Sequence, residues 1–557
     1  MGFGRLVESN RGAPAVRGEP WRALRGDGST APSPAGLPVD GGPTLLGSTA
    51  THDPRVTARE VWARRRPLDM NEDERMRMNI QGQTEIDEKR DRVLRGSIGG
   101  TLLWLGLPLM AVQLVNVSYN IADAYWLSRY SEIAYAAPRQ VMPTFMLWNA
   151  VAQGLIAANL ALLTQLVGAR NYGEARRYIS YFVSAALMVN SVIAVVYFFL
   201  RPFIFRYIVG TPPQLYGDTM TYSRIITLDI VFSAFTLTYS TILQSIGDTR
   251  TPATINALAA LANVILDPLF ILGVNAGGVQ LLPAMGVAGA AYATVLSRLA
   301  GLLLLLRRLS TKYPYMVPKL TLHIEREWIL RSIRIGAPVS LMMASNSLAF
   351  MLQNNLINQF GEYTAAAAAI GLILMDLADA TLWGFTGSVS IMVGQALGAG
   401  LTERARRVAS KAMLYIGLST LVGSLIAFTV RDAFINAFTG NPVIVREARV
   451  FVATFIPSLP FFALFFIGVS IGRGSGHTVF PTILGVVRLW AVRILLGYIL
   501  SFNLGLGSLG VWIAMSLSNI VSGAVMVPWV LKGSWAVPIV KAGEIQVPSA
   551  RGTGFKH

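Results

Sequence analysis

Twelve apolar segments, each about 20 residues or longer, recur between residues 98 and 531. An α-helix rises about 1.5 Å per residue, so each segment is long enough to cross the ~30 Å hydrocarbon core of a bilayer. Backbone groups in lipid must bond within their own segment, which favours helices. The sequence therefore predicts an all-α membrane protein. The predicted spans are 98–127, 136–166, 178–200, 219–246, 252–274, 286–306, 333–360, 364–397, 404–430, 446–472, 481–503 and 508–531.

Both ends of the chain lie outside these spans. Residues 1–66 are rich in Gly, Pro, Arg and Ser, and residues 70–95 are charged and compatible with a helix. The first stretch is interpreted either as a flexible tail or as the result of a wrongly assigned start, with Met70, Met76 or Met78 as the true one. The predicted division is an N-terminal tail (1–96), a first lobe (97–310), a cytoplasmic linker (311–332), a second lobe (333–531) and a C-terminal tail (532–557).

Basic residues in the loops predict the orientation in the membrane. With the N-terminus inside, the inner loops carry sixteen Lys and Arg residues and the outer loops eight. This asymmetry places both termini of a multi-pass plasma-membrane protein in the cytoplasm. It also accounts for the net charge of +17 without a nucleic-acid partner. The chain has no cysteine, which excludes disulfides, thiolate metal sites and thiol nucleophiles.

An internal repeat divides the spans into two equal sets. Gln165–Arg177 ("QLVGARNYGEARR") matches Gln395–Arg407 ("QALGAGLTERARR") at an offset of 230, and Gly106–Pro108 matches Gly336–Pro338 at the same offset. Six is an even number, so both copies have the same topology. The predicted fold is twelve transmembrane helices in two six-helix lobes, related by a parallel pseudo-two-fold repeat. Such lobes usually enclose a cavity that opens alternately to each side.

Polar side chains form single faces on several spans of the first lobe. A charged side chain at the centre of a span costs about 2.5–3.5 kcal/mol on insertion scales, so these residues usually have a function. Depths estimated from the helix rise place the acids in the outer half of the membrane, where one cavity can collect them. The candidate residues are Asn116, Asn120 and Asp123 in the first span, Asp229 in the fourth, Asn256, Asn263 and Asp267 in the fifth, and Thr294 in the sixth.

Charged residues of the second lobe differ from those of the first. At the offset of 230, Asn263 corresponds to Arg493 and Asp123 to Gln353. Arg488 and Arg493 are expected to be structural, pairing with acids or carbonyls of the second lobe. Asp376, with Asp379, is expected to form a second acidic site or a gate.

Several motifs, taken in order, resemble the multidrug and toxic-compound extrusion (MATE) family. They are "QLVGAR…GEARR", "LQSIGDTRTPATINALAALANVILDPLFI", "GVAGAAYATVLSR", "VGQALGAG…ARR" and "VVRLWAVRILLGYIL". Each is weak alone, but the resemblance extends over residues 97–531 at matching spacing. It implies a cation site in the first lobe at Asp123, Asn263, Asp267 and Thr294.

Residue chemistry leads to the same hypothesis. Carboxyl groups that share a low-dielectric pocket cannot all ionise freely, so the pocket can take up a proton, or Na⁺ through carboxylate, amide and hydroxyl oxygens. We expect an antiporter that uses H⁺ or Na⁺ to export small organic, often cationic, compounds. It is expected to be a monomer, with no cofactor beyond the coupling ion and no catalytic residue.

Local alternatives exist for three of the acids. Asp123 also fits an interfacial acid at the end of its span. Asp267 precedes Pro268, so it also fits a helix N-cap, and the proline is expected to free the carbonyl of Asn263. Asp229 also fits an ion pair with Arg224.

Three other functions compete with antiport. A flippase for lipid-linked saccharides or other amphiphiles should have a lateral opening and a strongly basic cavity. A channel would show single-channel conductance. A membrane enzyme is disfavoured, because the four histidines lie outside the middle of the spans and no HExxH motif is present. The histidines are His52, His323, His477 and His557.

Overall fold

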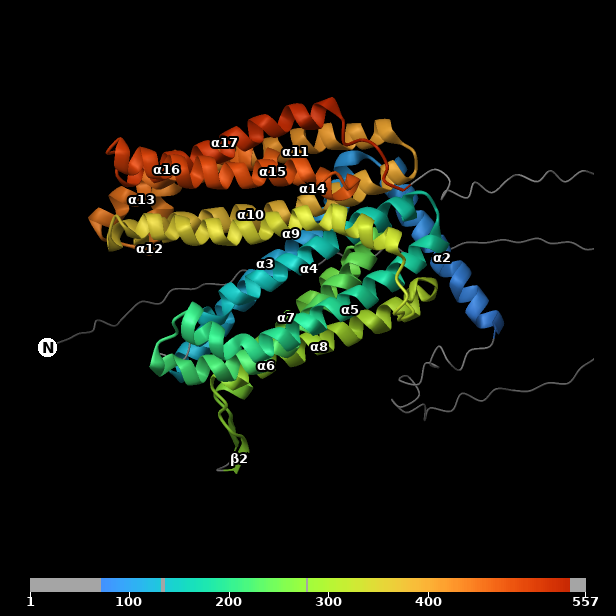
Figure 1. The fold of residues 1–557 in the computed structure, drawn as a ribbon, viewed down its shortest axis with the longest axis horizontal. Coiled ribbons are helices and arrows are strands. Elements are labelled where there is room, and N and C mark those ends of the chain that lie inside the picture. Colours follow the sequence, from blue (N-terminus) through green and yellow to red (C-terminus); the bar gives the residue numbers. More distant parts are fainter. Residues whose placement is uncertain (1–71, 132–135, 277–278, 541–557) are drawn as a thin grey trace, which may run out of the picture. The chain divides into compact units, whose positions relative to one another are not determined.

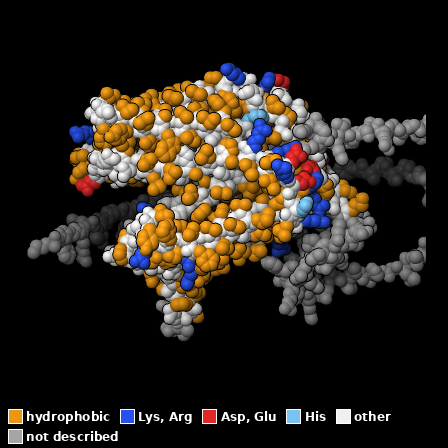
Figure 2. Space-filling model, in the orientation of Figure 1, with side chains coloured by type: hydrophobic (Ala, Val, Ile, Leu, Met, Phe, Trp, Pro, Cys, Tyr) orange, Lys and Arg blue, Asp and Glu red, His pale blue; other side chains and the backbone are white. Residues whose placement is uncertain are grey.

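Long helices make up most of the described chain. The computed structural model describes residues 72–131, 136–276 and 279–540. Within these residues, twelve helical spans are long and apolar enough to cross a membrane, which confirms the predicted all-α fold. Hydrophobic side chains cover the flanks of the helices, as expected for surfaces that face lipid (Figure 2). The tail predicted at 1–66 and the alternative start at Met70 lie outside the described residues.

The first lobe contains six long helices and one short hairpin. Strands β1 (Val274–Ala276) and β2 (Val279–Leu282) pair antiparallel between the fifth and sixth spans, where the sequence predicted a loop. Many of the helices extend a few residues past the predicted spans, because helix geometry continues beyond the apolar core. The helices are α3 (Ile98–Tyr130), α4 (Ala137–Gly168), α5 (Tyr172–Phe203, followed by the π-turn η3, Ile204–Ile208), α6 (Pro213–Ser245), α7 (Arg250–Ile271) and α8 (Val287–Lys312).

The second lobe repeats this order with two interrupted spans. The tenth span is α13 (Pro442–Phe455), the turn η5 (Ile456–Ser458) and α14 (Leu459–Ser475). The eleventh alternates α-helical and π-helical pieces: α15 (Val479–Val487), η6 (Arg488–Leu495), α16 (Leu496–Tyr498) and η7 (Ile499–Asn503). The other helices are α9 (Arg326–Asn358, preceded by the turn η4, Pro314–Met316), α10 (Glu362–Gly398), α11 (Thr402–Thr429), α12 (Arg431–Phe438) and α17 (Ser508–Lys532).

The two lobes pack together mainly through α3 and α4 of the first and α9 and α10 of the second. Their helices approach at the end where α2 lies and separate toward the opposite end (Figure 1). Close approach at the α2 end depends on glycine. A Cβ on Gly168 would collide with the carbonyl of Gln395, and a Cβ on Gly398 would collide with the carbonyl of Gln165. The two contacts are reciprocal and related by the offset of 230, as a pseudo-two-fold axis requires.

Helix α2 (Glu72–Arg95) bridges both lobes. Arg90 donates from Nε and Nη2 to the carbonyl of Gly168 in the first lobe, at 2.9 and 2.7 Å. Arg404 of the second lobe donates from Nη2 to the carbonyls of Val93 and Gly96, at 2.7 and 2.8 Å. The final quarter of the segment expected to be a flexible tail is thus a helix held against both lobes.

A cluster of charges fixes the middle of α2 to the first lobe. Lys312 Nζ lies 2.7 Å from Glu85 Oε1, and the Tyr313 hydroxyl donates to Asp248 Oδ2 at 2.7 Å. Lys89 donates to the same tyrosine oxygen, also at 2.7 Å. Burial raises the pKa of the Asp248 carboxyl, but the Thr251 amide, the Tyr313 hydroxyl and the two lysines outweigh burial and hold it below its usual range. Burial acts in the same direction on Glu85, and its two lysine partners likewise lower the pKa overall.

The chain beyond α17 also contacts the first lobe. The backbone amide of Ile539 donates to Gln165 Oε1 at 2.8 Å, and the side chain of Trp535 is fully buried. Residues 533–540 of the predicted C-terminal tail are therefore packed, and residues 541–557 lie outside the described chain.

Candidate functional site

Two acids from α3 and α7 meet inside the first lobe. The carboxyl groups of Asp123 and Asp267 lie within hydrogen-bonding reach of one another. Asn263, one turn before Asp267 on α7, donates from Nδ2 to Asp267 Oδ1 at 3.3 Å. Asn263 and Asp267 are 1% and 0% exposed. The structure thus brings the carboxyl of the first span next to the amide and carboxyl of the fifth, as the sequence predicted.

Thr294 on α8 adds a hydroxyl to this cluster. Its side chain is buried and lines the same cavity as Asn263. The hydroxyl also lies within hydrogen-bonding reach of Tyr119, which is one turn before Asp123 on α3. Helix α8 packs closely on both α6 and α7, so the threonine is placed by the core of the first lobe.

Within the described part of the chain, each of the four clustered residues has a buried oxygen that makes no hydrogen bond of good geometry. These oxygens are Asp123 Oδ1, Asn263 Oδ1, Asp267 Oδ2 and Thr294 Oγ1. Buried polar atoms are normally satisfied, and several unsatisfied acceptors in one cluster indicate a place for a missing positive partner. Two carboxylates, an amide and a hydroxyl are hard oxygen ligands that suit a proton or an alkali cation.

Asp229 on α6 is neutralised by a residue that the sequence interpretation missed. Arg298 Nε lies 2.6 Å from Asp229 Oδ1 in an ion pair whose aspartate is buried and whose arginine is partly exposed. The alternative of a pair with Arg224 is therefore wrong. Arg298 is four residues after Thr294 on α8, so it lies on the same helix face. That spacing is the signal by which the arginine could have been found.

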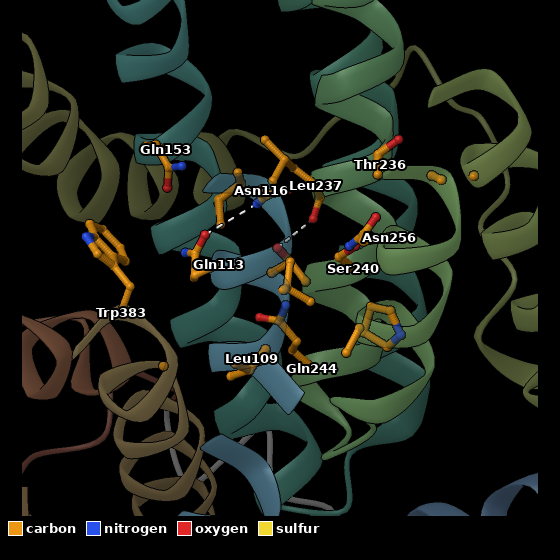
Figure 3. A pocket seen from close by; sticks show the side chains of 18 of the residues that line it. Leu109, Gln113, Asn116, Gln153, Thr236, Leu237, Ser240, Gln244, Asn256 and Trp383 are labelled. Carbon is orange, nitrogen blue, oxygen red and sulfur yellow. Dashed lines mark hydrogen bonds between the residues drawn. The ribbon is translucent and has the colours of Figure 1, made fainter. Parts of the chain in front are cut away.

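The remaining amides of the first lobe line a central cavity of about 280 Å³ between the lobes. Asn116 donates to Gln113 Oε1 at 3.4 Å, and Asn256 to Ser240 Oγ at 3.5 Å. Figure 3 shows these side chains together, with Trp383 of the second lobe apart from them. Asn120 belongs to α3, but its side chain is outside the described part of the chain.

The predicted acids and arginines of the second lobe lie elsewhere. Asp376 and Asp379 on α10 line a larger cavity of about 920 Å³, together with Arg488 and Arg493. Both arginines donate to Asn519 Oδ1, the carbonyl oxygen of a side-chain amide on α17. Of the two expected kinds of partner in the second lobe, these bonds therefore use a carbonyl, and among the described residues neither arginine forms an ion pair with an acid.

Pro268 lies inside α7 and does not end it. The helix continues to Ile271, so Asp267 is not an N-cap. A residue's amide normally bonds to the carbonyl four residues earlier, so the proline leaves the carbonyl of Val264 without its helical donor. The prediction that the proline frees the carbonyl of Asn263 is therefore wrong by one residue.

Twelve spans in two repeated lobes around a cavity are the architecture of a multi-pass membrane transporter. The MatE family profile matches residues 108–269 and 338–499, two copies separated by the predicted offset of 230. The chain belongs to the MATE family.

Relatives in this family carry transport names. The chain is 25% identical over 434 residues to "Probable multidrug resistance protein YoeA" of Bacillus subtilis (strain 168), covering 75% of this chain and 92% of that protein. It is 27% identical over 333 residues to "FAD transporter" of Shewanella oneidensis, covering 59% of this chain and 71% of that protein. The structure described as "Outward-facing conformation of a multidrug resistance MATE family transporter of the MOP superfamily" has a TM-score of 0.72 and 24% identity, covering 80% of this chain and 98% of that one.

Proposed function

We propose that this transporter is a secondary antiporter, which uses inward movement of H⁺ or Na⁺ to export small organic compounds. The observation that carries the proposal is the cluster of unsatisfied oxygens on Asp123, Asn263, Asp267 and Thr294. A cation held there supplies the positive partner that these buried acceptors lack. The proposal includes a monomer in the plasma membrane with both termini cytoplasmic and no cofactor.

Helix α3 is suited to couple the cation site to the substrate cavity. It carries Asp123 and contacts both α7 and α10, so it touches the cation site and the opposite lobe. It also contains Pro108, a point at which a helix bends easily. Residues Leu109, Gln113 and Asn116, just beyond this proline, line the central cavity. Cation binding that changes the bend of α3 therefore changes the cavity wall.

The ion pair Asp229–Arg298 assigns different roles to the three acids. Asp229 has a permanent positive partner 2.6 Å away, whereas the partners of Asp123 and Asp267 among the described residues are each other and neutral groups. Asp123 and Asp267 are the groups whose charge an incoming cation would change. Asp229 instead positions α8, which carries Thr294.

The proposed substrate class is based on the names of related proteins. One has a printed name of probable multidrug resistance protein and another of FAD transporter, so exported organic compounds are the shared expectation. The helices of the two lobes separate toward the end away from α2 (Figure 1), and this end is the outer side under the orientation predicted from the loop charges. The arrangement fits release of substrate outward.

Transport in proteoliposomes tests the proposal. Purified protein is reconstituted, loaded with a fluorescent organic cation such as ethidium, and given an inward proton gradient without Na⁺ or an inward Na⁺ gradient at fixed pH. One of the two gradients should accelerate efflux above the rate without a gradient. Equal efflux with and without either gradient would contradict coupling.

A flippase is the second candidate, because one of its expected features, a cavity with an excess of basic residues, is present. Arginines outnumber aspartates in the larger cavity. An apolar groove of about 510 Å³, lined by α3, α10 and α11 among others, also lies on the membrane-spanning part of the protein. Accelerated transfer of a fluorescent phospholipid between leaflets, independent of H⁺ or Na⁺ gradients, would favour this function over antiport.

A further inference from the structure

The larger cavity, which is separate from the proposed cation site, carries more basic than acidic side chains. Its volume is about 920 Å³, and side chains from both lobes form its walls. Four arginines and two aspartates line it, which gives an excess of positive charge when all are ionised. The arginines are Arg139, Arg473, Arg488 and Arg493, and the aspartates are Asp376 and Asp379.

Two of these arginines are deeply buried, and Asp379, an acid that lines the same cavity, forms no ion pair with either of them. Arg488 and Arg493 are 4% and 2% exposed. Their described hydrogen bonds go to neutral side chains: Arg488 Nη1 donates to Asn519 Oδ1 at 3.0 Å, and Arg493 Nε donates to Ser518 Oγ at 3.0 Å. Among the residues that the structure describes, no carboxylate forms an ion pair with either guanidinium. Buried charges are usually paired, so this arrangement leaves a negative partner to be supplied.

The π-helical segment η6 brings the two guanidinium groups to one side. Residues five apart are separated by about 140° around an α-helix, so an ordinary helix would direct Arg488 and Arg493 to different faces. A π-helix bonds residues five apart, which places them one above the other. The shared acceptor confirms this geometry, since Asn519 Oδ1 lies 3.0 Å from Arg488 Nη1 and 3.2 Å from Arg493 Nη2. π-Helical segments inside α-helices frequently occur at functional sites.

The pseudo-two-fold repeat relates this site to the acid cluster of the first lobe. At the offset of 230 that the two family matches show, Arg493 is the equivalent of Asn263, and Gln353 is the equivalent of Asp123. Arg493 Nη1 donates to Gln353 Oε1 at 3.4 Å, so these two positions are in contact in the second lobe. The second lobe thus has a positive group at the position where the acid cluster of the first lobe has a neutral amide.

Aromatic rings stand beside the arginines. The guanidinium of Arg488 lies 4.4 Å from the Phe465 ring centroid, and that of Arg473 lies 5.0 Å from the Trp383 centroid. The Nε groups of Arg473 and Arg488 are buried and have no acceptor among the described residues. Rings that already contact the guanidinium groups provide surfaces on which a flat ligand can stack.

We propose that the second-lobe cavity is a binding site for the anionic group of an aromatic organic anion, held by Arg488 and Arg493 with Arg473 at the border of the central cavity. The inference rests on the proposed function, because it names a substrate class for the same carrier. The sulfonate, carboxylate or phosphate group of such a ligand supplies the absent negative charge. Its ring lies against Phe465 and Trp383.

Equilibrium binding without any gradient tests this site. The full-length protein in phosphatidylcholine nanodiscs is dialysed against radiolabelled naphthalene-2-sulfonate, and against the matched neutral methyl sulfone and trimethylammonium analogues of naphthalene. The sulfonate should bind more tightly than both analogues. Arg488→Gln and Arg493→Gln should each weaken sulfonate binding about tenfold or more, because each removes a charged hydrogen-bond donor. Equal affinities for the three probes, or unchanged sulfonate binding in both variants, would overturn the proposal.

A second variant keeps the test valid if an arginine substitution impairs folding. Asn519→Asp is nearly isosteric and puts a carboxylate within 3.2 Å of both guanidinium groups. It should abolish sulfonate binding while both arginines remain. Arg446→Gln on α13 is the matched control, since this arginine does not line the cavity and should leave binding unchanged. Sulfonate binding retained in Asn519→Asp would contradict the site.

Two further comparisons separate the possible origins of a result. Displacement of the sulfonate by phosphatidylglycerol added to the nanodiscs would assign the arginines to a lipid phosphate and overturn a soluble anion. Sulfonate binding that persists while no gradient drives efflux would contradict the proposed antiport and leave this site standing. Gradient-driven efflux of ethidium without sulfonate binding would support the proposed antiport and contradict the anion site.

Discussion

Arg298 Nε lies 2.6 Å from Asp229 Oδ1 across the α6–α8 interface. Because Asp229 already has this positive partner, Asp123 and Asp267 are the two acids proposed to bind a cation. The carboxylate of Asp229 is 2% exposed, so it depends on its partner. Removing one member of a buried ion pair typically costs about 3–5 kcal/mol, because the other charge stays buried and unpaired.

The first prediction is that Arg298→Gln destabilises the protein and that Asp229→Asn partly reverses the loss. The double variant leaves no unpaired charge, so its melting temperature in detergent should exceed that of Arg298→Gln alone. Thermal unfolding followed by circular dichroism measures all three variants. A double variant less stable than either single variant would contradict a direct pair.

The Thr294 hydroxyl is predicted to contribute an oxygen to the coupling cation. Thr294→Val keeps the shape and removes the oxygen, so the concentration of coupling ion needed for half-maximal efflux should rise about tenfold. Thr294→Ser restores an oxygen and should behave like the unmodified protein. The dependence of the initial efflux rate on ion concentration measures the effect. Equal behaviour of the valine and serine variants would exclude the hydroxyl from the site.

The α2 charge cluster is predicted to be sensitive to acid. The pKa values of Glu85 and Asp248 are lowered in the folded protein, so their contribution is complete above the ordinary carboxyl pKa and is lost as pH falls through the lowered values. Hydrogen–deuterium exchange in α2, corrected for the intrinsic pH dependence of exchange, should be slow at neutral pH and faster under strongly acidic conditions.

Asp248→Asn should produce the same faster exchange in α2 at neutral pH, because it removes the carboxylate that Tyr313 and the two lysines share. Glu88→Gln is the control, since this exposed residue of α2 belongs to none of these described contacts. Slow exchange of α2 in Asp248→Asn would show that the arginine contacts alone hold the helix.

The reciprocal glycine contacts predict how the lobes close. Gly398→Ala introduces a Cβ that collides with the carbonyl of Gln165, so it should separate the lobes at the α2 end. The chain has no cysteine, so spin labels at Thr311→Cys and Arg407→Cys can report the distance without background. The distance should lengthen in Gly398→Ala and stay unchanged in Gly173→Ala, where a Cβ meets nothing within 4 Å. A distance that does not respond to Gly398→Ala would contradict tight closure there.

Hydropathy and the cost of polar groups in lipid predicted much of this structure. The thickness of the bilayer sets the length of each apolar segment. The twelve helices and the repeat could therefore be predicted from the sequence. The four-residue spacing of Asn263 and Asp267 predicted that both lie on one face of the helix. Because exposing polar groups to lipid is costly, that face was predicted to point into the protein. This reasoning and the family resemblance together led to the four residues proposed for the cation site.

The features that were missed depend on contacts between distant segments or on local departures from α-helical geometry. Asp229 and Arg298 are 69 positions apart in the chain, and hydropathy does not tell which basic residue faces which acid. The π-helical turn that aligns Arg488 with Arg493 breaks the spacing rule on which the sequence interpretation relied. Helix α2 is too polar to be recognised as a packed element, since charges and backbone carbonyls hold it in place.

The central claim is that Asp123 and Asp267 bind the coupling ion, and gradient-driven efflux in proteoliposomes tests it most directly. Asp123→Asn and Asp267→Asn should each reduce efflux under the effective ion gradient to the rate without a gradient. Binding of the exported compound, measured on the same preparations, should persist. Gradient-driven efflux at the unmodified rate in both variants would contradict the claim.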